Sequence, residues 1–350
     1  MVLSNDDAIK VGLIGLGFAG THLHLGPLMQ NRRAKLVFAA DLDAQKIAAF
    51  KISSTSFADV LTSTDWRDVT QSSSVDAVIV ATPTTSHLEI VSQALSAGKH
   101  VFCEKPVSIN IEDALKMRDH ARRHPDKVLM IGQVLRFWPD YVEANKLVAS
   151  GKIGAPRIAR TQRTVPMPSG WYTQEELSGG VTLDLLLHDI DFLVWTMGRV
   201  KTVYAQGNNC LGRGDKSFID FVQVHLTFET GAIAHLEASW AVPDTYPFTT
   251  ALEISGTAGM LSMDNSPQAT SLEQTIKGQP MARSAPSERN GYFFEQDAFF
   301  AAVKQNNCKS PVSVDDVLHP LEVALAAKQS IKTGENVSLN ALTEGIGAVR

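Results

Sequence analysis

Short apolar runs alternate with segments of helical character through the first third of the chain. The runs are largely apolar throughout, as in parallel strands that helices cover on both faces. Strands are predicted at 10–14, 36–40, 76–81, 100–103 and 128–131. Helices are predicted at 21–30, after Asp43, at 87–97 and at 111–123, and the serine-rich stretch 51–75 predicts only short elements. This alternation predicts an α/β domain with a doubly wound parallel sheet over residues 1–132.

From residue 133 onward, longer segments appear in which apolar and polar residues alternate. They lie at 157–165, 200–208, 218–228, 232–240 and 250–255. Alternation with turn-length links predicts a large, mostly antiparallel open sheet with one face toward solvent or a partner. Residues 265–290 predict an exposed excursion, and helical periodicity returns at 293–305 and 315–332. We therefore predict a second domain, of α+β class, over residues 133–350.

A glycine motif directly follows the first predicted strand. Gly15, Gly17 and Gly20 form the pattern G-x-G-x-x-G at the passage from strand to helix. Gly15 would permit a sharp turn, Gly17 would leave room for a pyrophosphate against the backbone, and Gly20 would let the helix lie close to the strand. The helix N-terminus would offer unpaired N–H groups to the phosphates. The motif therefore predicts a dinucleotide site.

Four residues of the first domain lie where predicted strands end: Gly15, Asp41, Thr82 and Lys105. The carboxyl ends of parallel strands meet at one edge of a sheet, which is where such sheets bind ligands. Asp41 stands where a carboxylate binds the ribose, and with no arginine beside it we expect NAD to be preferred over NADP. A lysine at a strand end is usually a solvated charge, but Lys105 lies on the nucleotide side and precedes a proline.

The segment 179–195 is apolar nearly all round, which predicts a buried helix. Asp184, His188 and Asp191 stand at i, i+4 and i+7, so an α-helix would place them on one face. Buried ionisable groups must pair with one another or open onto a polar cavity. The segment therefore predicts either an Asp–His pair within the core or a polar site. A metal site is disfavoured because no second cluster of His or Cys accompanies it.

Composition excludes several classes of partner. A net charge of −5 without a basic run argues against nucleic acid or an anionic membrane. The cysteines, Cys103, Cys210 and Cys308, are odd in number and lack metal-ligand spacing, so we expect a reduced, cytoplasmic setting without a metal. No basic region precedes the first apolar run, and charges interrupt every apolar stretch, so neither a signal peptide nor a membrane span is expected.

The motifs together resemble the Gfo/Idh/MocA family of NAD(P)-dependent oxidoreductases, the glucose-fructose oxidoreductase and inositol dehydrogenase group. The matching pieces are GLGFAG at 15–20, Ala81-Thr82-Pro83 with His87, Glu104-Lys105-Pro106, Arg136-Phe137-Trp138-Pro139, and Gly179-Gly180 with Asp184, His188 and Asp191. They run in family order and cover nearly the whole chain. Thr84 departs from the family, which often has Asn at this position of the cofactor loop.

The resemblance implies a Rossmann domain followed by an α/β domain whose open sheet packs against other subunits, in a homodimer or homotetramer. The cofactor-binding residues that it implies are Gly15, Gly17, Phe18, Ala19, Gly20, Asp41, Ala81, Thr82, Pro83, His87, Glu104, Lys105 and Gln133. It implies catalysis by Lys105, Asp184 and His188. The residues predicted to line a sugar pocket are Arg136, Trp138, Trp171 and Tyr172, together with Asp184 and His188; the alternative is that the tryptophans belong to the core.

The residue types predict a mechanism for oxidising a secondary alcohol of a sugar, sugar derivative or cyclitol. His188 takes the hydroxyl proton as general base, because imidazole titrates near neutral pH. Lys105 stabilises the developing alkoxide and can share the proton transfer with His188, so the division of the base role between the two stays open. Asp184 orients the substrate or His188. An NAD-dependent glycosidase of the same fold and a non-catalytic sugar sensor are the alternatives.

Overall fold

The structure is a computed structural model that describes residues 8–213, 218–265, 272–283, 289–305 and 308–339. The chain forms two compact units. Unit 1 comprises the described residues of 1–137 and 289–317, and unit 2 those of 138–288 and 318–350. Sequence patterns placed the domain boundary after residue 132 and did not anticipate that 289–317 returns to the first unit. The return has a packing cause, because Phe299 of helix α9 (Gly291–Lys304) is fully buried with its ring against Phe102.

Unit 1 is built on a parallel sheet with strand order β3-β2-β1-β4-β5-β6 in its described part. The strands are β1 (Ile9–Ile14), β2 (Ala34–Ala40), β3 (Leu61–Ser63), β4 (Ala77–Val80), β5 (His100–Glu104) and β6 (Leu129–Gly132). This order confirms the predicted Rossmann topology, in which the chain reverses its winding between β1 and β4. Ile14 pairs with both Ala40 and Val80, so the ends of β1, β2 and β4 lie level at one edge.

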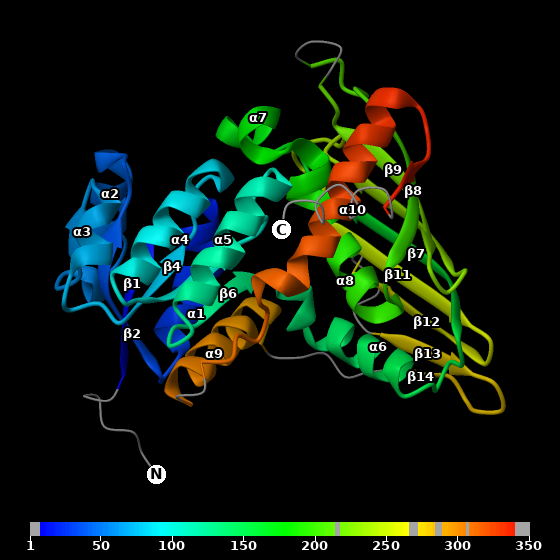
Figure 1. Cartoon of the computed structure of the whole chain (residues 1–350), viewed down its shortest axis with the longest axis horizontal. Helices are drawn as coiled ribbons and strands as arrows, with labels where there is room; N and C mark the ends of the chain where they lie inside the picture. The colour runs from blue at the N-terminus through cyan, green and yellow to red at the C-terminus, as the bar shows by residue number, and fades with distance from the viewer. Residues whose placement is uncertain (1–7, 214–217, 266–271, 284–288, 306–307, 340–350) are drawn as a thin grey trace. The chain divides into compact units, whose positions relative to one another are not determined.

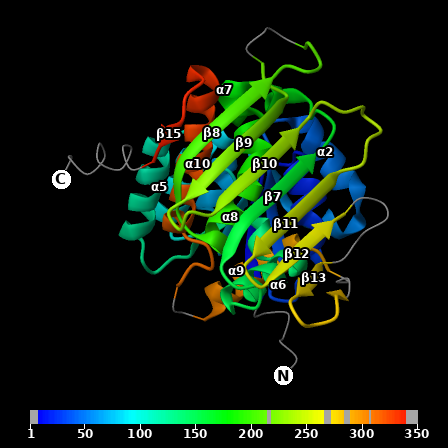
Figure 2. The same ribbon diagram turned by 90° about the vertical axis from the view of Figure 1, so that its right-hand side faces the viewer.

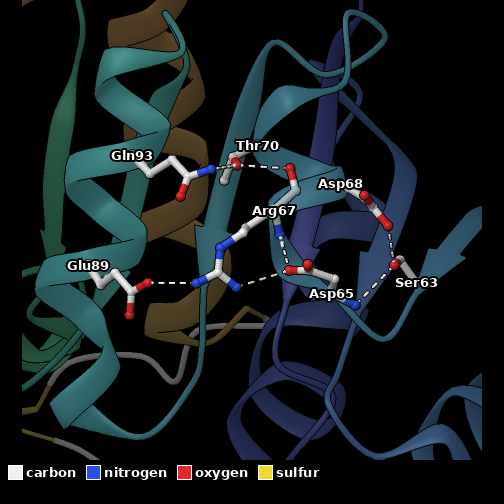
Figure 3. A network of polar contacts seen from close by, with 7 residues as sticks. All are labelled: Ser63, Asp65, Arg67, Asp68, Thr70, Glu89 and Gln93. Carbon is white, nitrogen blue, oxygen red and sulfur yellow. Dashed lines mark hydrogen bonds and ion pairs between the residues drawn. The ribbon is translucent and has the colours of Figure 1, made fainter.

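Helices lie against the sheet of unit 1 (Figure 1). They are π-helical η2 (Ala19–His24), α1 (Leu25–Gln30), α2 (Ala44–Ser53), η3 (Thr55–Phe57), α3 (Trp66–Gln71), η4 (Thr84–Ser86), α4 (His87–Ser96), α5 (Ile111–Arg123), η5 (Val134–Arg136) and α9. Helix α2 begins after Asp43 as predicted, and the Asp43 carboxylate caps it by accepting the N–H of Gln45. Figure 3 shows how α3 is tied to α4, with Arg67 donating to Glu89 at 2.8 Å. Both side chains are largely exposed, so this ion pair adds little stability.

Unit 2 is built on a larger sheet with strand order β14-β13-β12-β11-β7-β10-β9-β8-β15 among the described residues. The strands are β7 (Pro156–Thr164), β8 (Val200–Asn208), β9 (Phe221–Phe228), β10 (Ile233–Ser239), β11 (Thr249–Gly256), β12 (Gly259–Asp264), β13 (Glu273–Ile276), β14 (Ala282–Arg283) and β15 (Val337–Ser338). Its pairs are antiparallel except β10 with β7, which confirms the predicted mostly antiparallel sheet. The predicted excursion 265–290 lies partly outside the described residues, and its described part contains β13 and β14.

One face of this sheet packs on helices and the other is open. Behind the strands lie α6 (Pro139–Ala149), α8 (Leu187–Met197) and the part of α10 (Val314–Thr333) that belongs to unit 2, and no helix crosses in front of them in Figure 2. Burial alternates along the strands: in β10, Ala234 and Leu236 are buried while Ile233 is half exposed. Smaller helical elements are η6 (Gly170–Thr173), α7 (Glu175–Ser178) and π-helical η7 (Thr182–Leu186).

Candidate functional site

The glycine motif of unit 1 has the geometry that its predicted role requires. Gly15 has φ +100°, and a Cβ there would lie 2.4 Å from the Ala81 carbonyl oxygen. A Cβ on Gly20 would lie 2.0 Å from the Gly15 carbonyl oxygen. A Cβ on Gly17, in contrast, would meet no atom within 4 Å. Two glycines are therefore required by packing, and the middle one leaves open space beside bare backbone.

Asp41 links the end of β2 to the glycine motif. Its Oδ2 accepts the N–H of Leu16 at 2.8 Å, and its Oδ1 accepts the N–H of Asp43 at 2.9 Å. Lys46 Nζ lies 3.7 Å from Asp41 Oδ2. The sequence prediction of NAD preference considered only the lack of an arginine and missed Lys46. The one sign of this lysine in the sequence is its place three residues after Asp43, near the start of the predicted helix. The carboxylate thus stands at the predicted edge of the sheet, but with a cation nearby.

The loop after β4 is clamped by His87. This side chain is 1% exposed, with Nε2 3.0 Å from the Thr82 carbonyl oxygen and Nδ1 3.0 Å from that of Pro106. Burial lowers the pKa of His87, and a neutral imidazole carries one N–H, so it donates to one carbonyl at a time. The clamp joins the Thr82 loop to the residue after Lys105. A direct contact of His87 with the cofactor stays a prediction.

Thr84 lies in the same loop, at the position where the sequence departs from the family. Its side chain is 3% exposed, and its Oγ1 has no hydrogen-bond partner within the described chain. An unsatisfied buried hydroxyl is uncommon in a folded protein.

Lys105 stands out from a buried strand end. Over residues 101–108, all of which the structure describes, Lys105 alone is partly exposed. The preceding Glu104 accepts the Lys105 N–H at 2.9 Å and contacts His24 Nε2 at 2.6 Å. Burial raises the pKa of Glu104, but the His24 hydrogen bond and nearby charges lower it by more, so the net pKa lies below its ordinary value. Glu104 is therefore an anion, and His24 is its partner.

The remaining predicted residues of unit 1 differ in exposure. Phe18 is 60% exposed and stacks on His22 with ring centroids 4.9 Å apart, whereas Gln133 is buried. Arg136 donates from Nη2 to the Asp316 carbonyl oxygen at 3.2 Å. That contact is with the start of α10 and could not be read from local sequence.

In unit 2, the predicted catalytic pair lies on an otherwise buried helix. Over residues 181–193, a range described without gaps, only Asp184 and His188 are partly exposed. Asp184 lies in η7 and His188 in the first turn of α8. Asp191, expected on the same face, is 1% exposed. The structure therefore brings two of the three predicted polar residues to the accessible side of the helix.

Sequence reasoning missed a buried ion pair beside this helix. Arg163 of β7 donates to both oxygens of Asp189, at 2.6 and 3.1 Å, and also to the Tyr141 hydroxyl. Burial lowers the pKa of Arg163, but Asp189 raises it by more, so the net pKa lies above its ordinary value. The pair holds Asp189, the residue next to His188, in place. Its sequence signal was a charged residue at an inward position of an alternating strand.

Three predicted pocket residues belong to unit 2 and are partly exposed. Trp171 and Tyr172 lie in η6 and stack with ring centroids 4.1 Å apart. Trp138 precedes the first turn of α6. The aromatic side chains therefore are not enclosed in the core, and their contact with a sugar stays a prediction.

The edge of the unit 1 sheet fits a dinucleotide. The open space beside Gly17 suits a pyrophosphate, and the carboxylate of Asp41 suits a ribose hydroxyl. Within the described ranges, no three His, Cys, Asp or Glu side chains are grouped so as to hold a metal ion.

Comparison with known families agrees with this geometry. Residues 9–133 match the model of an oxidoreductase family with an NAD-binding Rossmann fold, GFO_IDH_MocA, and residues 141–262 match the model of the GFO/IDH/MocA C-terminal domain. The chain belongs to the Gfo/Idh/MocA family. It is thus an NAD(P)-dependent oxidoreductase, as its motifs predicted.

Individual members of the Gfo/Idh/MocA family match along the whole chain. The uncharacterized oxidoreductase YrbE of Bacillus subtilis is 30% identical over 95% of this chain and 96% of its own length. Myo-inositol 2-dehydrogenase of Thermotoga maritima is 28% identical over 95% of this chain and 98% of its own. The solved structure of myo-inositol 2-dehydrogenase from Lactobacillus plantarum superposes with a TM-score of 0.80 at 26% identity, covering 95% and 99% of the two chains.

Proposed function

We propose that this Gfo/Idh/MocA oxidoreductase transfers a hydride between NAD and a secondary hydroxyl of a sugar, sugar derivative or cyclitol. One observation carries the proposal. Lys105 in unit 1, and Asp184 with His188 in unit 2, are the partly exposed members of segments that are otherwise buried. Ionisable groups held in this way are the type that general acid–base chemistry uses. The inositol dehydrogenases among its relatives support the substrate class.

In the proposed reaction, His188 accepts the proton of the substrate hydroxyl. Lys105 donates a hydrogen bond to the same oxygen and stabilises the negative charge that develops there. Asp184, four residues before His188, orients the substrate or the imidazole. NAD, when bound, supplies the acceptor for the hydride. The residues that would hold it are those of the glycine motif, Asp41, the 81–83 loop, His87, Glu104, Lys105 and Gln133.

The preference for NAD over NADP rests on Asp41. Its carboxylate would repel a 2′-phosphate, and its two N–H contacts fix it in position. Lys46 works in the opposite direction, because an ammonium group 3.7 Å from the carboxylate reduces that repulsion. We propose that the carboxylate dominates, since Lys46 is on a flexible and half-exposed side chain.

The substrate would be held by Arg136, Trp138, Trp171 and Tyr172. Aromatic faces suit the C–H faces of a sugar or cyclitol ring, and a guanidinium group donates to hydroxyls. The accessibility of Trp171 and Tyr172 in η6 supports this role over one in the core.

We further propose that the open face of the unit 2 sheet packs against a second copy, giving a homodimer or homotetramer. Ile233 and Ile158 are neighbours in the sheet and are 51% and 38% exposed. Beside them, strands β7 and β10–β13 line a hollow of about 430 Å³ on this face, and none of the predicted catalytic residues lines it. Light scattering of an Ile158→Asp, Ile233→Asp double variant should show a smaller assembly than the wild type; an unchanged mass would refute the proposal.

No helix in the described parts of the chain is long and apolar enough to cross a membrane. The cysteine pattern remains the basis for proposing a cytoplasmic location.

The central test is a panel of inositols, sugars and sugar derivatives assayed with NAD and with NADP, following NADH absorbance. Lys105→Met and His188→Asn should each reduce kcat by roughly 10²–10⁴-fold, the range for losing a positioned acid or base, with NADH affinity largely retained. Product analysis separates the alternatives: a glycosidase would release sugar without net NADH, and a sensor would bind without turnover. Full activity of either variant would refute the assigned role.

A further inference from the structure

A buried polar chain runs from helix α9 to the residue before Lys105. Gln296 of α9 approaches His24 Nδ1 with its Nε2 at 2.9 Å, and His24 Nε2 lies 2.6 Å from Glu104 Oε1. Glu104 Oε2 accepts the backbone N–H of Lys105 at 2.9 Å. His24 and Gln296 are both 0% exposed. Three segments far apart in the sequence thus meet at one strand end of unit 1.

The contacts of Gln296 fix the tautomer of His24. The same Nε2 also lies 3.1 Å from the His24 backbone carbonyl oxygen, which can only accept a hydrogen bond. The atom facing His24 Nδ1 is therefore the amide NH₂ group, so Nδ1 must accept. The imidazole then carries its proton on Nε2, which donates to Glu104.

We propose that Gln296 and His24 are positioning residues for Lys105, acting through Glu104; this rests on the proposed role of Lys105 in catalysis. His24 holds one oxygen of the Glu104 carboxylate, and the other oxygen fixes the Lys105 amide at the end of β5. Without the His24 donor, a buried carboxylate oxygen would be unsatisfied, and the carboxylate would have to turn away from the Lys105 amide.

Two aromatic rings pack against the His24 imidazole. Phe102 and Tyr292 each make a T-shaped contact with the imidazole, with ring centroids 5.2 and 6.1 Å from its own. Because the imidazole is fully buried among these rings, a change at His24 must be transmitted to Glu104 rather than absorbed by solvent. A displacement of about 1 Å in a reacting group is enough to reduce turnover by about 10²-fold.

A matched pair of variants separates positioning from packing. In His24→Gln, the side-chain amide can place an N–H donor where Nε2 stands, and the hydrogen bond to Glu104 is kept. In His24→Asn, the shorter amide can replace only the Nδ1 acceptor, and the hydrogen bond to Glu104 is lost. Both variants remove the imidazole, so a purely structural role predicts similar losses in both.

Turnover is measured with the polyol that reduces NAD fastest in the panel above. We expect kcat to fall ~10- to 100-fold in His24→Asn, up to the loss of about 10²-fold that a misplacement of about 1 Å causes, and less than about threefold in His24→Gln. NADH affinity, measured by fluorescence titration, should fall much less than kcat in both, because Glu104 and Lys105 are only two of the residues that would hold the cofactor. Equal losses of kcat, or a loss confined to NADH affinity, would overturn the proposal.

A measurement on the wild-type protein tests the tautomer without any variant. ¹⁵N-detected histidine NMR should show His24 protonated at Nε2 alone, and Gln296→Met should yield a mixture of tautomers. Protonation at Nδ1 in the wild type would overturn the proposal. Failure of the proposed function would give a different result. Lys105→Met would then turn over normally, while the His24 spectrum would still show protonation at Nε2 and so the hydrogen bond to Glu104.

Discussion

The ion pair between Arg163 and Asp189 gives a stability prediction whose size follows from its burial. The two side chains are 5% and 0% exposed, and two hydrogen bonds join them. Asp189→Asn removes the negative charge and turns an NH₂ group toward the guanidinium, which stays charged and buried. Removing one partner of such a pair costs about 3–5 kcal/mol. Because Arg163 keeps its hydrogen bond to Tyr141, we expect the lower end, about 3 kcal/mol of unfolding free energy.

The assay is urea unfolding followed by tryptophan emission, since Trp240 of unit 2 is fully buried. A loss of about 3 kcal/mol corresponds to a fall in Tm of about 6–12 °C for a unit of this size. Glu229→Gln is the matched control in the same unit, because Glu229 and its partner Arg199 are both more than half exposed and the pair should contribute less than about 1 kcal/mol.

A double variant completes the test. Replacing Arg163 by Met and Asp189 by Leu removes both charges, and apolar replacement of a buried pair is often neutral. It should be more stable than Asp189→Asn alone. The reasoning fails if Asp189→Asn costs no more than the surface control, or if the double variant is no more stable than the single one.

Four other substitutions test three further expectations. Gly17→Ala should leave Tm unchanged but weaken NADH binding, because its Cβ enters empty space, whereas Gly20→Ala should lower Tm, because its Cβ would lie 2.0 Å from a backbone oxygen; matching Tm values would contradict this. Asp41→Ala should raise the ratio of kcat/KM for NADP to kcat/KM for NAD about tenfold or more, because losing about 1.4 kcal/mol of repulsion changes this ratio tenfold. An unchanged ratio would show that Asp41 does not determine the cofactor preference. The pKa of Glu104 is lowered on folding, so its ionisation stabilises the fold above about pH 4.3 and that stabilisation disappears as pH falls further. Glu104→Gln should therefore show a smaller fall of Tm between neutral and acidic pH than the wild type, and parallel curves would disprove the linkage.

The first unit could be predicted closely because its strands are buried on both faces. Such strands are short continuous apolar runs, and β1, β2, β4, β5 and β6 each end within a residue or two of the predicted position. β3 was missed because it is three residues long at the sheet edge. The same holds for β14 and β15, which are two residues each and too short to show a period.

The candidate site was predictable where a single position carries the signal. A glycine, an acid or a lysine at the end of an apolar run can be read from the chain itself. Contacts between distant residues could not be, because nothing local distinguishes them: His24 and Glu104 are 80 residues apart, and Asn31 and Asp297 are 266 apart. The domain assignment of 289–317 was missed for this reason, since α9 packs on unit 1 through such contacts.

The two π-helical turns explain the helical positions that sequence reasoning misplaced. A π turn contains about one residue more than an α turn, so it rotates everything beyond it relative to an uninterrupted α-helix. In η7 the turn contains Asp184 and precedes His188; the two remain partly exposed, but Asp191 is rotated into the core. In η2 the last residue is His24, which is buried against Glu104 while the apolar Leu23 before it is partly exposed. A helical wheel with 3.6 residues per turn assigns neither arrangement. In both units, therefore, the extra residue decides which ionisable side chain faces the interior, and the histidines that we assign to proton transfer and to positioning Lys105 owe their orientation to it.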